Sequence, residues 1–125
     1  MLLSTYSNSN TFLQIFYPTM EVFMFSNYEL SLFQSDYFSN FSYENGIIEV
    51  QSKNTGHWWL IFRMDMPRST MVAVRHRYPS VKKYHVQCHV HTLLKAYTMI
   101  KEHDTYILKK HSIDQSKSSS QSPYL

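Results

Sequence analysis

The first 45 residues contain no lysine, arginine or histidine, although the 125-residue chain carries twelve Lys and Arg and seven His. Four acidic side chains give this segment a formal charge of −4, whereas twelve basic and five acidic residues give the rest of the chain +7. A charge asymmetry of this size separates two regions of different physical character. Any surface for a polyanion is therefore expected within residues 46–125.

Glycine, cysteine and long apolar runs are also scarce. With only Gly46 and Gly56, the chain has no glycine-rich loop of the kind that cradles nucleotide phosphates. The single cysteine, Cys88, cannot form an intrachain disulfide, which favours a reducing compartment. The chain start lacks the basic region of a secretory signal, and its apolar stretch is interrupted by polar residues and a proline. We therefore expect a cytoplasmic protein without a membrane segment.

A hydrophobic content of 43% and an aromatic content of 16% suffice for one small core. The pattern along the chain predicts three regions. Residues 1–43 form an aromatic, acidic and partly disordered N-terminal arm, in which only residues 29–37 show helical spacing. Residues 44–108 form an α+β domain, and residues 109–125 form a disordered, serine-rich tail.

Period-two alternation and turn residues define the strands of the predicted domain. The expected strands are Ile47–Gln51, His57–Arg63, Met71–Arg77 and Tyr84–Val90. Thr92 is suited to cap a helix over Leu93–His103, whose apolar side chains recur at helical period. The expected fold is a meander of three or four antiparallel strands packed on one C-terminal helix.

The two faces of this sheet should carry different side chains. The alternation assigns Trp58, Leu60 and Phe62 to the core beneath the helix. Trp59 and Arg63 then point to the opposite face. Because one helix covers one face of an antiparallel sheet, we expect this second face to meet solvent.

The predicted outer face and the basic loop beside it suggest a nucleic-acid interface. Its candidate residues are Trp59, Arg63, Arg75, Arg77, Lys82, Lys83 and Gln87. Cations at these positions would neutralise phosphates, Trp59 would stack on bases, and Gln87 would reach base edges. This hypothesis describes a small accessory protein that binds DNA or RNA. The competing interpretation is an ordinary solvated face.

Three histidines on the last predicted strand raise the alternative of a metal site. His85, His89 and His91 would share one face of that strand. At the rise of a strand they lie about 13 Å and 7 Å apart, whereas zinc–nitrogen bonds measure about 2.0–2.1 Å. We therefore expect no cofactor, with zinc as the alternative.

Residues with catalytic chemistry are not grouped in a recognisable way, so we expect no enzyme. Cys88 lies between His85 and His89, yet it alternates with Val86 and Val90 as a core residue would. The acidic, aromatic N-terminal arm suggests a third function, a module that binds another protein. The same arm is also suited by charge to fold back on the basic sheet face.

Overall fold

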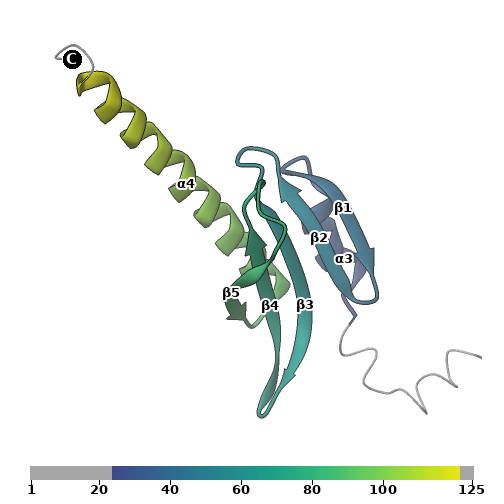
Figure 1. The fold of residues 1–125 in the computed structure, drawn as a ribbon. Coiled ribbons are helices and arrows are strands. Elements are labelled where there is room, and N and C mark those ends of the chain that lie inside the picture. The colour runs from purple at the N-terminus through teal and green to yellow at the C-terminus, as the bar shows by residue number, and fades with distance from the viewer. Residues whose placement is uncertain (1–23, 122–125) are drawn as a thin grey trace, which may run out of the picture.

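The computed structural model describes residues 24–121 (Figure 1). Its elements are α3 (Asn27–Ser31), the 3₁₀ turn η2 (Leu32–Gln34), β1 (Phe38–Glu44), β2 (Ile47–Ser52), β3 (Trp58–Met66), β4 (Ser69–Arg77), β5 (His85–Val90) and α4 (Leu93–Gln121). The strands form one antiparallel sheet in sequence order. The protein is therefore α+β, with five strands instead of the three or four predicted.

Strand β1 lies in the segment that was predicted to be an arm. Asn45 and Gly46, with φ of 54° and 77°, form its two-residue turn into β2. An Asn-Gly pair suits this turn because both positions need positive φ. Asn40, with φ of 55°, lies where the pairing shifts between Ser39 and Ser42, and this bulge interrupts the alternation that marks a strand.

Apolar residues before and at the start of the sheet belong to the core. Phe25, Leu30, Phe33 and Phe38 are buried, and the Phe33 and Phe38 rings stack with centroids 5.2 Å apart. Burial of such a side chain contributes about 1.5–3 kcal/mol. The predicted boundary at residue 44 therefore does not separate these buried side chains from the core. Residues 1–23 of the predicted arm lie outside the described residues.

Helix α4 begins where it was predicted and ends much later. The Thr92 hydroxyl oxygen accepts a 3.0 Å hydrogen bond from the amide of Lys95, as a helix cap does. The helix buries Leu93, Ala96 and Ile100. It then continues to Gln121, and its second half projects beyond the sheet (Figure 1). No glycine or proline interrupts the chain over these residues, and the predicted tail from residue 109 is helical as far as Gln121.

The side chains of β3 lie on the faces opposite to those predicted. Val50 pairs with Trp59, which is completely buried, while Trp58 is half-buried on the other face. Both alternations along β3 are apolar, so the pattern alone did not select the inner one. The pairing of β2 with β3 selects the inner face. The Ser52 amide donates to the His57 carbonyl at 2.9 Å, and the register that follows places Trp59 beside Val50.

Both described helices lie behind the sheet in the view of Figure 1, so one face carries no helix, as predicted. We call this the outer face, and the face that packs against α3 and α4 the inner face. Among the side chains on the outer face are Glu49, Trp58, Leu60, Phe62, Arg75 and Arg77. Within residues 24–121, none of the helices has the length and apolar character needed to cross a membrane.

Candidate functional site

Cations stack on aromatic rings across the outer face. The guanidinium of Arg77 lies 4.7 Å from the ring centroid of Trp58 and 5.3 Å from that of Tyr84. The guanidinium of Arg75 lies 5.3 Å from the Phe62 ring. Strand pairing produces the first contact, because Trp58 and Arg77 are direct partners on β3 and β4. The result is a surface of alternating π-faces and positive charge.

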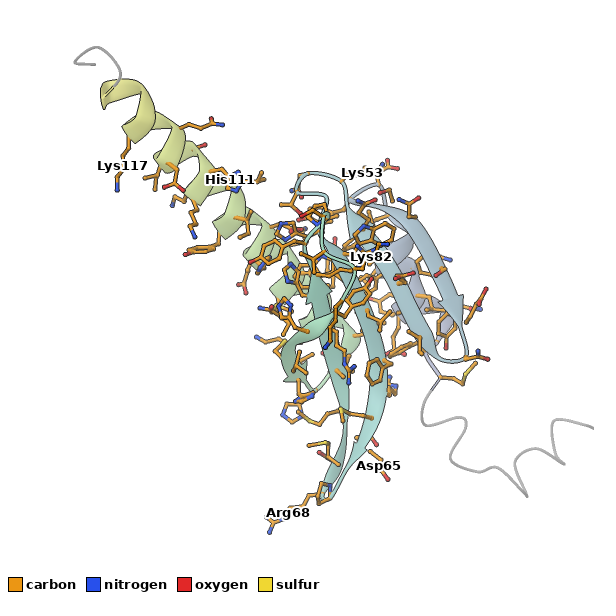
Figure 2. The ribbon with its side chains drawn as sticks, viewed as in Figure 1. Lys53, Asp65, Arg68, Lys82, His111 and Lys117 are labelled. Atoms are coloured by element: carbon orange, nitrogen blue, oxygen red, sulfur yellow. The ribbon has the colours of Figure 1, made fainter. Side chains whose placement is uncertain are left out.

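The loop between β4 and β5 folds over part of this face. Tyr84 donates its hydroxyl to the Glu49 carboxylate at 2.7 Å, and Arg77 donates to the loop backbone at 3.0 Å. Burial, followed by the hydrogen bond to Glu49, raises the pKa of the Tyr84 phenol above its ordinary value. Lys82 and Lys83 remain exposed on the loop, and Figure 2 shows Lys82 in front of the sheet. The carboxylate of Glu49 is thus occupied while the lysines are free to meet a ligand.

Part of the predicted nucleic-acid set lies together on this side of the molecule: Arg75, Arg77, Lys82 and Lys83. Trp59 does not, because it is buried on the inner face. Arg63 is also on the inner face, where it donates to the Glu29 carboxylate at 2.9 Å. Gln87 is half-buried on β5. The aromatic residues of the outer face that sequence reasoning missed are Trp58, Phe62 and Tyr84.

A second polar group lies between the sheet and α4. His57 precedes β3, His76 ends the inner face of β4, and His103 comes from α4. One ring nitrogen from each lies within 4.8 Å of those from the other two. His57 Nδ1 and His76 Nε2 are 2.8 Å apart, and His76 Nδ1 is 3.3 Å from His85 Nε2. We call His57, His76 and His103 the histidine cluster.

Trp59 lies between the histidine cluster and the apolar core. The Trp59 ring lies 4.6 Å from that of His76 and 5.1 Å from that of His103, centroid to centroid. Its indole nitrogen donates to Ser52 Oγ at 2.9 Å, so the polar edge of the ring is satisfied. Strand pairing puts the Trp59 ring beside the cluster, because Trp59 is the direct partner of His76 on β4.

Burial favours the neutral imidazole at two members of the cluster, His57 and His76. It lowers the pKa of His76 to about 3, and repulsion from protonated His103, His57 and His85 acts in the same direction. Burial, then His103, lowers the pKa of His57 as well. Each neutral ring offers one donor and one acceptor nitrogen.

Asp104 supports the cluster from the side of α4. This fully buried carboxylate accepts hydrogen bonds from Tyr37 Oη at 2.6 Å and Thr55 Oγ1 at 3.0 Å. Burial alone would raise the pKa of Asp104, but the polar side chains around it, His103 and Ser52 foremost, lower it. His103 Nδ1 lies 3.9 Å from Asp104 Oδ1 and is buried without a hydrogen-bond partner in the described part of the chain.

An open cleft of about 530 Å³ adjoins the cluster. Its lining includes His57, Tyr78, Ile107, Lys110, His111 and Asp114. Figure 2 shows His111 on α4, near the point where the helix leaves the sheet. His57 therefore belongs both to the cluster and to the wall of the cleft.

The predicted metal ligands are not brought together. Pairing between β4 and β5 skips Gln87, and this bulge reverses the alternation within β5. His85 therefore pairs with His76, whereas His89 is exposed on the other side and His91 is exposed beyond the strand. The prediction that these three histidines share a face is wrong. The histidines of the cluster come from three separate elements, so no local spacing in the sequence connects them.

No protein-family model, curated protein or solved structure matches this chain. We therefore take the candidate functions from the chain's own residues and their geometry.

Proposed function

We propose that the protein is a non-enzymatic, cytoplasmic nucleic-acid-binding protein that holds a single strand of DNA or RNA on its outer face. The observation that carries the proposal is the guanidinium of Arg77 over the rings of Trp58 and Tyr84, beside Arg75 on Phe62. Unpaired bases stack on aromatic rings and on guanidinium planes, whatever their sequence.

Charge on this side of the molecule supports the same function. Arg75, Lys82 and Lys83 are exposed, and each is suited to contact a phosphate. Glu49 is held by the Tyr84 hydroxyl at 2.7 Å. A strand that crosses Trp58 would therefore meet the positive charge of Arg77 and Arg75 on the neighbouring strand β4.

Fluorescence anisotropy with a labelled single-stranded oligonucleotide, over a series of salt concentrations, tests the proposal. The double variant Arg75→Ala/Lys82→Ala removes two exposed charges from the site. Arg68→Ala/Lys109→Ala removes two charges elsewhere, at the tip of the β3–β4 hairpin that Figure 2 labels and on α4. If both site cations contact phosphates, the slope of log affinity against log salt falls by about 1.4 in the first variant, at about 0.7 per contact. We expect the control to keep the parent slope.

Stacking is tested separately with Trp58→Leu. We expect it to weaken binding by about 1–3 kcal/mol, which is the usual contribution of one stacked base, while the salt slope stays unchanged. Equal losses in the two double variants would mean that attraction is spread over the whole protein. Absence of binding at low salt would remove the nucleic-acid function.

A further inference from the structure

We propose that the histidine cluster binds a divalent transition metal of the zinc type. His57, His76 and His103 supply the three protein ligands, and the fourth position opens toward the cleft. This site is separate from the outer face and goes beyond nucleic-acid binding.

The spacing of the ring nitrogens fits this coordination after small movements. One nitrogen from each ring lies within 4.8 Å of those from the other two, and His57 Nδ1 and His76 Nε2 are already 2.8 Å apart. Zinc–nitrogen bonds of about 2.0–2.1 Å in a tetrahedron separate two nitrogens by about 3.3 Å. His57 Nδ1 and His76 Nε2 must therefore move apart by about half an ångström, and the two nitrogens that lie farthest apart must approach by at most about 1.5 Å. Rotation of imidazole rings about their side-chain torsions covers such shifts.

The second nitrogens of two rings already face the partners that a metal site needs. His76 uses Nε2 toward His57 and Nδ1 toward His85 Nε2, at 3.3 Å. His103 Nδ1, which is buried and lacks a hydrogen bond among the described residues, lies 3.9 Å from the Asp104 carboxylate. Metal-bound histidines usually donate their other N–H to a carboxylate or similar acceptor, which fixes the ring. Coordination through the remaining nitrogen would bring His103 Nδ1–H to Asp104.

The donor set selects the class of metal. The cluster found in the described part of the chain consists of three histidines and no carboxylate, while Asp104 is held by Tyr37 and Thr55. Imidazole suits zinc, copper, nickel and iron, whereas magnesium and calcium take oxygen ligands. Three protein ligands with an accessible fourth position are the arrangement in which zinc keeps a water or an exogenous ligand.

A metal here would also join three elements of the fold. Its ligands are the residue just before β3, a residue of β4 and a residue of α4 that lies beyond Ile100, the last buried apolar side chain described in that helix. Binding to the folded state alone raises the melting temperature. Metal should therefore strengthen the attachment of α4 to the sheet.

The experiment uses the full chain, stripped of metal with a chelator and titrated with Co²⁺ and then with Zn²⁺. We expect one Co²⁺ per chain with the visible absorption of a tetrahedral site, displacement by Zn²⁺, and a higher melting temperature. His103→Asn should weaken binding by about 100-fold or more and abolish the thermal shift. His89→Asn, which changes an exposed histidine outside the cluster, should bind as the parent does.

Circular dichroism without metal establishes whether His103→Asn is folded. If it is not, ¹⁵N NMR of the parent protein decides, because zinc should shift the ring nitrogens of the histidine cluster and leave those of His89 and His91 unchanged. The proposal is overturned by the absence of stoichiometric binding. It is equally overturned by a folded His103→Asn with parent affinity, or by zinc-induced shifts confined to His89 and His91.

Discussion

Replacement of Trp59 with alanine is expected to destabilise the protein far more than the same change at its neighbour Trp58. Trp59 is completely buried on the inner face, where its ring packs on His76 and its indole N–H donates to Ser52 Oγ at 2.9 Å. Trp58 is half-buried on the outer face, where it lies beneath the guanidinium of Arg77. The pair compares two faces of one strand with the same chemical change.

The magnitudes follow from these surroundings. Truncation of a buried tryptophan costs about 3–5 kcal/mol, and loss of the hydrogen bond to the buried Ser52 hydroxyl adds about 1 kcal/mol. For Trp58, truncation removes a side chain that is only partly buried, together with a cation–π contact of about 0.5–1 kcal/mol. A total of about 1–2 kcal/mol is expected at Trp58. The two variants should therefore differ by about 2–3 kcal/mol or more.

Urea unfolding followed by far-UV circular dichroism measures both values without using tryptophan as the probe. Both variants should keep the parent dependence on urea, so that the change in midpoint reports stability. A larger loss at Trp58 than at Trp59 would refute the register, because it would mean that the even-numbered side chains of β3 form the core.

One alkylation, two further substitutions and one truncation test other parts of the structure. Burial raises the pKa of the Cys88 thiol, so less thiolate exists at neutral pH. The rate of its alkylation by iodoacetamide should therefore be lower than that of free cysteine. This rate should rise about tenfold per pH unit until the pH passes the raised pKa. Asp104→Asn should cost about 2–4 kcal/mol in urea unfolding, because a buried carboxylate that accepts from Tyr37 at 2.6 Å loses charge-assisted hydrogen bonds. Gly56→Ala should lower the stability measured by thermal melting by about 1–2 kcal/mol, since Gly56 has a φ of +77°. Deletion of residues 110–125 should change stability by less than about 0.5 kcal/mol, because the described side chains of this segment are exposed; a large loss would show that the projecting half of α4 supports the fold.

Local chemistry in the sequence was enough to locate most secondary structure. Four strands and the start of α4 were predicted within a few residues, because alternation, turn residues and the Thr92 cap act over short distances. The β1 strand was missed although Asn45-Gly46 is a hairpin signal, since the bulge at Asn40 conceals the alternation before it. The length of α4 was missed because the side chains described over residues 108–117 are all exposed, so no buried apolar stripe marks these turns.

The faces of the strands depended on pairing between distant residues. Along β3 both alternations are apolar, and only the register with β2 places Trp59 in the core and Trp58 outside. In β5, Gln87 has no partner on β4, so His85 and His89 lie on opposite faces of the sheet instead of the same one. A shift of one residue exchanges the two faces of a strand, so errors of register move whole groups of side chains.

The basic half of the chain and its supply of histidines were evident from the sequence alone. The particular histidines that meet were not. The histidine cluster forms only when β3 pairs with β4 and α4 packs across the sheet. Asp104 lies beside it on α4, where its carboxylate accepts hydrogen bonds from Tyr37 and Thr55. Composition and local periodicity report what each segment carries, whereas a site built from three elements exists only once long-range packing has brought them together.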